Sequence, residues 1–242
     1  MTTPLIIVST VFFAACVQSI SGFGFALIVM PLLSMAVGLQ TAAPLVALAA
    51  LTLYTVNLIR YRQAVDVRRV LRLGVACAFG VPVGIWVLAN VDESAVKRLM
   101  GLVLVAYAVY KLSNPAALYL RSDRWAHGSA YIIGFIAGCM GGAYNAPGPP
   151  LVVYGSLRQW PRDEFRATLQ AFFFINGVLT VSSHYVAHHL TATVWTLYAY
   201  AVPAFLLGVL TGSRIDERLN RDRFRTIVTV MILVLGLSLI FG

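Results

Sequence analysis

Residues 1–59 read MTTPLIIVSTVFFAACVQSISGFGFALIVMPLLSMAVGLQTAAPLVALAALTLYTVNLI and contain no Asp, Glu, Lys, Arg or His. A transmembrane helix needs about 20 apolar residues to cross a hydrocarbon core roughly 30 Å thick. A stretch of 59 residues therefore holds two or three passages that fold back on one another. It predicts a helical membrane protein.

The rest of the chain repeats this pattern. Further stretches without Asp, Glu, Lys or Arg are Leu73–Val91, Trp125–Leu157, Ala167–Ser213 and Thr226–Gly242, and all nine acidic residues fall between such stretches. The 242 residues are 60% hydrophobic and 11% charged, with a mean hydropathy of +0.82. A soluble domain carries about a quarter charged residues. The composition excludes disorder, a disulfide scaffold and a soluble nucleic-acid binder, and predicts an all-α polytopic membrane protein.

Nothing in the sequence indicates a cofactor. Cys16, Cys77 and Cys139 lie in apolar stretches without a close pair or a C-x-x-C motif, which is typical of small core residues. No spacing suits a metal site. The net charge of +9 would suggest a nucleic-acid partner in a soluble protein, but in so apolar a chain the placement of the charge matters more.

Two segments resemble each other at a fixed offset. Ser21–Met30 aligns with Asn145–Tyr154, and 145 − 21 = 124. Later in the chain Asp92 aligns with Asp216, and 216 − 92 is again 124. We therefore predict a first repeat over residues 1–112, a cytoplasmic linker over 113–128 and a second repeat over 129–242.

Each repeat begins with an apolar unit that Gly and Pro interrupt near its middle, and three ordinary spans follow. The interrupted units are Pro4–Val37 and Ser129–Leu157, and the spans are about 40–59, 73–90, 96–112, 167–186, 192–212 and 225–242. If each interrupted unit is a hairpin that leaves on the side it entered, 16 of the 18 basic residues lie on the cytoplasmic side. Single crossings would place 8 inside and 10 outside. The hairpin interpretation is favoured, and it makes the second repeat inverted relative to the first, as in many secondary transporters.

Backbone that leaves helical geometry at membrane depth is tolerated only inside protein or beside a polar cavity. Gly22 and Gly24 permit positive φ, and Pro147, Pro149 and Pro150 force the second unit out of regular helix. Each interruption creates a helix N-terminus that attracts anions. Sparse polar residues gather nearby, namely Gln18, Ser21, Asn145, Gln170 and Asn176. The plain alternative is that small and polar residues only mediate helix packing.

The predicted site has no full countercharge. No Asp or Glu falls within a predicted span, and Lys and Arg are absent from the middle of every span. An anion would then be held by helix dipoles, amides and hydroxyls. His184 is the one candidate for titration near neutral pH, and an interfacial histidine is the favoured interpretation.

Some of these residues also resemble a known family. The interrupted first segment, the run Gly138-Cys139-Met140-Gly141-Gly142-Ala143-Tyr144-Asn145-Ala146-Pro147-Gly148-Pro149-Pro150 and the following Arg166-Ala167-Thr168 resemble the sulfite exporter TauE/SafE family, also called the 4-toluene sulfonate uptake permeases. The resemblance spans essentially the whole chain.

It implies a bacterial inner-membrane carrier for small sulfur-containing anions such as sulfite, sulfoacetate or other organosulfonates. It also implies that the two interrupted segments form the substrate site, with Ser21, Gly22, Gly24, Asn145, Pro147 and Gly148 in that role. The first segment, Ser21-Gly22-Phe23-Gly24-Phe25, is less glycine-rich than the family pattern, and its two phenylalanines suggest an apolar wall for an organic sulfonate.

Three classes of function compete. A secondary transporter is favoured. A channel with paired half-helices is the second class, although Asn145-Ala146-Pro147 has the wrong order for an Asn-Pro-Ala motif. An intramembrane enzyme is the third, but Ser21 has no His or acidic residue near it to act as a base. Apolar stretches do not distinguish a lipid-facing surface from the face of a homodimer, and both stay open.

Overall fold

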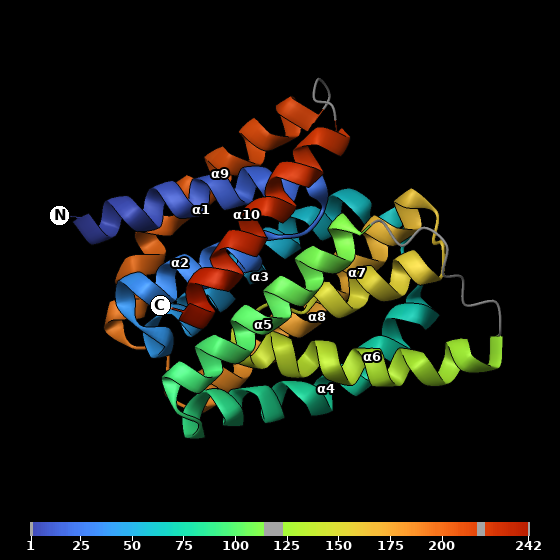
Figure 1. The fold of residues 1–242 in the computed structure, drawn as a ribbon, viewed down its shortest axis with the longest axis horizontal. Helices are drawn as coiled ribbons and strands as arrows, with labels where there is room; N and C mark the ends of the chain where they lie inside the picture. Colours follow the sequence, from blue (N-terminus) through green and yellow to red (C-terminus); the bar gives the residue numbers. More distant parts are fainter. Residues whose placement is uncertain (1, 114–122, 217–220, 242) are drawn as a thin grey trace.

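A computed structural model describes residues 2–113, 123–216 and 221–241, and these residues form ten α-helices and one 3₁₀ turn (Figure 1). Three segments are long and apolar enough to cross a membrane: Leu39–Ala64, Val67–Asn90 and Ala192–Ile215. Four shorter helical segments are also apolar: Leu5–Ser21, Phe25–Val37, Gly128–Tyr144 and Val228–Phe241. The expected all-α class is confirmed.

The helices follow one another with short connections. Their bounds are α1 Thr2–Ser21, α2 Phe25–Val37, α3 Leu39–Tyr61, α4 Val67–Asn90, α5 Glu93–Leu112, α6 Asp123–Tyr144, α7 Gly148–Leu157, α8 Arg162–Val186, α9 Ala192–Asp216 and α10 Arg221–Phe241. Helices α2 and α3 lie at the centre, and most of their residues are buried.

Several helices begin before the expected spans. Their first turns contain charged residues, which the expected spans left out. Asp66 caps α4 by accepting from the backbone N–H of Arg69 at 3.1 Å. Helix α8 starts at Arg162, five residues before the expected span beginning at 167 (167 − 162 = 5). Helix α6 starts at Asp123, inside the segment predicted as a linker, and residues 114–122 of that linker lie outside the described part of the chain.

Glycines allow α4 and α6 to pack backbone against backbone. A Cβ added to Gly84 would lie 2.1 Å from the carbonyl oxygen of Cys139, and one added to Gly138 would lie 2.7 Å from that of Cys77. A Cβ on Gly134 would lie 2.3 Å from the Leu73 oxygen. Because Leu73 faces Gly134 and Cys77 faces Gly138, the two helices run parallel. Small residues four apart promote such close packing in membranes.

Helices α1 and α9 form a second pair of this kind. A Cβ on Gly208 would lie 2.5 Å from the Phe12 oxygen, and one on Gly212 would lie 2.7 Å from the Cys16 oxygen. The paired helices come from opposite halves of the chain. In Figure 1 α1 lies beside α9, and α4 lies beside α6.

Two breaks interrupt the apolar units. The first break is Gly22–Gly24, between α1 and α2, and its two glycines have φ of 84° and 110°. The second break is Asn145–Pro147, between α6 and α7, and Asn145 has φ of 55°. Asn enters the left-handed region more readily than most residues. The second break is shorter than expected, because Pro149 and Pro150 lie in the first turn of α7, where a missing N–H is tolerated.

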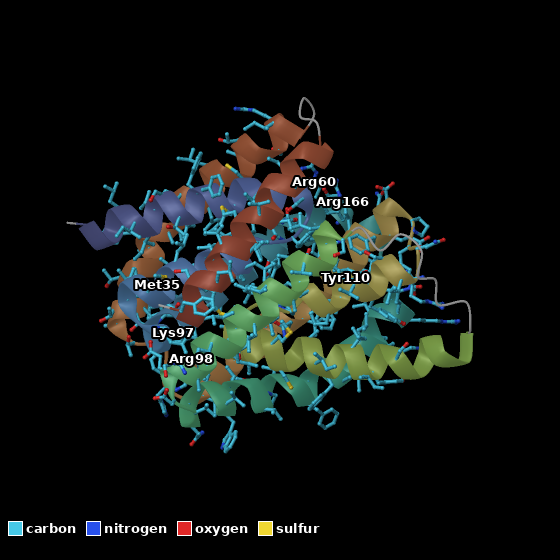
Figure 2. The ribbon with its side chains drawn as sticks, viewed as in Figure 1. Met35, Arg60, Lys97, Arg98, Tyr110 and Arg166 are labelled. Atoms are coloured by element: carbon cyan, nitrogen blue, oxygen red, sulfur yellow. The ribbon has the colours of Figure 1, made fainter. Side chains whose placement is uncertain are left out.

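Basic side chains mark the two ends of the bundle (Figure 2). Arg60 and Arg166 lie toward one end, called here the Arg60 end, and Lys97 and Arg98 lie toward the other, called the Lys97 end. At the Lys97 end, Glu93 accepts from the backbone N–H of Leu39 at 3.1 Å and pairs with Lys97 at 2.8 Å. The hydrogen bond from Lys97, followed by that from Leu39, holds the pKa of Glu93 below its usual value.

Candidate functional site

Gln18 joins the two helices on either side of the first break. Its Oε1 accepts from the backbone N–H of Phe25 at 3.0 Å, and its Nε2 donates to the Gly22 carbonyl at 3.4 Å. Ser21 donates from its Oγ to the Val17 carbonyl at 2.7 Å and also bonds the Phe23 carbonyl. These side chains stabilise a backbone that has left helical geometry inside the protein.

Gln170 reaches the same break from α8. Its Nε2 donates to the Gly22 carbonyl at 2.7 Å, and the residue is fully buried. Its Oε1 has no hydrogen-bond partner among the described residues. A buried acceptor in this position is normally satisfied by water or by a polar ligand. Gln170, which the sequence analysis names as a candidate, therefore lies beside an interrupted segment.

Arg166 brings a full positive charge to the first break. The residue is only 8% exposed, and its Nη2 donates to the Ile20 carbonyl at 3.1 Å. Its guanidinium carbon lies 6.0 Å from the centre of the Tyr61 ring. The sequence analysis places Arg166 in a cytoplasmic loop. The structure instead places Arg166 on α8, which begins four residues earlier (166 − 162 = 4), and buries its side chain.

The two breaks differ in the donors that they offer. The cap and first turn of α2 are Gly24, Phe25, Ala26 and Leu27, which all carry a backbone N–H, although that of Phe25 bonds Gln18. The corresponding residues of α7 are Pro147, Gly148, Pro149 and Pro150. Only Gly148 among these has an N–H, because proline has none. The first break therefore offers more backbone N–H donors than the second.

The second break is held by Asn145. Its Nδ2 donates to the Ala43 carbonyl of α3 at 2.8 Å, and the side chain is buried. Gly148 begins α7 against Phe173, since a Cβ there would lie 3.6 Å from the Phe173 ring. These contacts fix where α7 begins.

Asn176 lies away from the contacts of the first break. Its Nδ2 donates to the Cys77 sulfur at 3.3 Å, and its amide packs against Gly141. It is six residues along α8 from Gln170 (176 − 170 = 6), a rise of about 9 Å. Among the predicted residues, Gln18, Ser21, Gly22, Gly24 and Gln170 meet at the first break; Asn145, Pro147 and Gly148 form the second; and Asn176 joins α4, α6 and α8.

A cavity of about 670 Å³ adjoins the first break. It lies between the break and helices α5, α7 and α10. Its walls are mainly aromatic and aliphatic, with a few polar groups. The lining residues are Ser21, Phe23, Tyr107, Lys111, Val152, Gly155, Ser156, Gln159, Trp160, Phe165, Val228, Thr229 and Ile232. Except for Ser21 and Phe23, these residues belong to no interruption of the sequence, and no motif indicates that they meet.

His184 is buried, and its Nδ1 lies 3.0 Å from the Nδ1 of His189. Within the described ranges no group of three or more His, Cys, Asp or Glu side chains is arranged to hold a metal ion. The pair lies near the far end of α8, 14 residues from Gln170 (184 − 170 = 14), and takes no part in the first break.

Comparison with known proteins agrees with the resemblance carried by the Gly/Pro segments. The family described as "Sulfite exporter TauE/SafE" matches residues 7–239. A protein of Cupriavidus necator named "Probable sulfite/organosulfonate exporter TauE" is 27% identical over 228 residues, which cover 92% of this chain and 88% of that protein. No solved structure matches. The chain belongs to the sulfite exporter TauE/SafE family, whose members are multi-pass membrane exporters and not enzymes.

Proposed function

We propose that the protein is a secondary transporter of small sulfur-containing anions, such as sulfite, sulfoacetate or other organosulfonates, in the bacterial inner membrane. One observation carries the proposal above all others. Buried Arg166 and Gln170 meet the first break beside a cavity of about 670 Å³. The relative's name, which refers to sulfite and organosulfonates, supports the substrate class.

The first break has the chemistry that a sulfonate or sulfite group requires. Arg166 supplies charge, and the N-terminal turn of α2 supplies backbone N–H groups and the positive end of a helix dipole. Charge-assisted hydrogen bonds are stronger than neutral ones. The anionic group is accordingly assigned to the first break, and the second break is assigned to holding α7 in place.

The cavity suits the organic part of an organosulfonate. Phe23, Trp160 and Phe165 contribute aromatic walls next to Ser21. Burial of apolar substrate surface against such walls stabilises the complex by about 25 cal/mol per Å². Bare sulfite has no carbon to bury, so the cavity favours an organosulfonate over sulfite.

The helix pairs support an inverted repeat with alternating access. A shift of 124 residues moves Leu39–Tyr61 of α3 onto residues 163–185, which lie within α8. The same shift relates α1 to α6 and α4 to α9, so the pair α1–α9 corresponds to the pair α6–α4. Arg60 and Lys97 lie toward different ends of the bundle (Figure 2), which supports an orientation with the Arg60 end in the cytoplasm. In this scheme the two hairpins open the site to opposite sides in turn.

The function is tested with purified protein in liposomes. We expect saturable uptake of a radiolabelled organosulfonate, competition by sulfite, and counterflow when unlabelled substrate is trapped inside. Acetate serves as the control anion. Uptake that does not saturate and shows no counterflow would identify a channel, and competition by acetate but not by sulfonates would reject the substrate class.

Replacing Asn145 by alanine is expected to abolish transport while the protein still reaches the membrane. The change removes the hydrogen bond to the Ala43 carbonyl and leaves a residue at φ of 55° that disfavours that conformation. Asn145→Gly isolates the side chain, because glycine accepts the φ. Transport that is normal in Asn145→Gly would remove the side chain of Asn145 from the site.

A further inference from the structure

A second, smaller pocket at the Arg60 end is strongly positive. Its volume is about 220 Å³, and it lies between the start of α4, helix α6 and the connection from α7 to α8. The lining residues are Asp66, Arg68, Arg69, Arg72, Ala130, Tyr154, Arg158 and Trp160. Four arginines and one aspartate give a formal charge of +3 (4 − 1).

The arginines of this pocket differ in whether they have an acidic partner. Arg69 pairs with Asp66 at 3.3 Å and with Glu164 at 3.2 Å, and its guanidinium stacks 4.6 Å from the centre of the Trp160 ring. Arg68 and Arg72 have neither an acidic nor a hydrogen-bonding partner among the side chains that the structure describes. They are four residues apart on α4 and so lie on one face of the helix. Two charges thus face the pocket without a countercharge from the described protein.

An apolar face continues from these arginines along the bundle. On α4 the same stripe includes Val75 and Phe79, which are 53% and 70% exposed. On α6 the side chains of Ile132 and Phe135 are 63% and 41% exposed. Because α4 and α6 run parallel in close contact, the two exposed stripes extend in the same direction from the arginine pocket. The surface therefore has arginine side chains at one end and exposed apolar side chains along the rest of α4 and α6.

We propose that this surface binds one anionic phospholipid, with the phosphate of its headgroup at Arg68 and Arg72 and its acyl chains along α4 and α6. Basic pockets between membrane helices bind anionic headgroups by this combination of charge and apolar contact. A small soluble anion would use the arginines but not the apolar face. The proposal requires that the chain lies in a membrane and is independent of the transported substrate.

The arginine pocket shares a wall with the cavity beside the first break. Trp160 lines both spaces and stacks on Arg69. A lipid bound at Arg68 and Arg72 therefore lies one side chain away from the cavity. This contact gives the lipid a direct route to influence the shape of the cavity.

The test compares dioleoyl phosphatidylglycerol with dioleoyl phosphatidylcholine, added to the purified full chain in a neutral detergent and followed by native mass spectrometry and thermal shift. One Arg near a charged surface contributes about 1 kcal/mol, so the double variant Arg68→Gln/Arg72→Gln should bind phosphatidylglycerol roughly 30-fold more weakly. Phosphatidylcholine binding should change little. Arg60→Gln/Arg62→Gln removes the same charge from exposed residues outside the pocket and should keep the wild-type affinity.

Each outcome decides the proposal. It is overturned if Arg68→Gln/Arg72→Gln keeps full affinity for phosphatidylglycerol, or if the Arg60→Gln/Arg62→Gln control loses as much. Inorganic phosphate serves as the separate arm for a soluble anion. If millimolar phosphate stabilises the wild type as much as the lipid does and competes with it, the pocket is a free oxyanion site and the lipid assignment fails.

Discussion

Replacing Arg166 by glutamine is expected to reduce transport at low substrate concentration by roughly 100-fold, or about 3 kcal/mol. The Arg166 guanidinium donates to the Ile20 carbonyl beside the first break. Glutamine keeps an amide donor for the Ile20 carbonyl but removes the charge that attracts the substrate. Initial rates across substrate concentrations should show a raised KM.

The fold is expected to survive this change. A buried charge requires desolvation, and its replacement by a neutral side chain of similar shape is often tolerated. Arg166→Lys retains the charge without the planar fork and should retain part of the transport. Arg62→Gln, an exposed change in the same region, should behave as the wild type. A wild-type KM in Arg166→Gln with an unchanged melting temperature would remove Arg166 from the substrate site.

Replacing Gly84 by valine is expected to prevent normal folding. Even a single Cβ at this position would lie 2.1 Å from the Cys139 carbonyl oxygen and 2.8 Å from the Ala143 nitrogen. Both atoms belong to the backbone of α6, so the helices must separate. Overpacking typically costs about 1–3 kcal/mol, and two backbone collisions place this change at or beyond the upper end.

Ala78→Val is the control, since it places valine at an exposed position of the same helix. Size-exclusion chromatography and thermal unfolding in detergent measure the difference. We expect Gly84→Val to yield little monodisperse protein and Ala78→Val to resemble the wild type. Equal melting temperatures for the two variants would show that α4 and α6 are not tightly packed.

The sequence predicts the helical class and both breaks for physical reasons that act locally. Missing charge identifies the apolar stretches, and the breaks contain Gly22, Gly24 and Pro147, residue types that readily leave helical geometry. An offset of 124 residues also relates Gly84 to Gly208, and both glycines admit a neighbouring backbone. The tightness of those contacts was beyond prediction, because it depends on which helix lies opposite.

The contacts of the candidate site are most predictable for residues that are close to a break in the sequence. Gln18 and Ser21 are beside the first break, and their contacts follow from that position. The burial of Arg166 was not predictable, because a basic residue at the end of an apolar stretch resembles a loop anchor until the start of α8 is known. Tyr107 and Trp160 were missed because the cavity gathers them from distant parts of the chain.

The pairing of α1 with α9 has a consequence for how the protein is made. Phe12 faces Gly208, and 208 − 12 = 196 residues separate them. At 5–20 residues per second, a ribosome needs about 10–40 s to synthesise that interval. During this time α1 has no partner for the backbone surface that Gly208 and Gly212 later cover. The packing of α1 therefore waits for nearly the last helix of the chain.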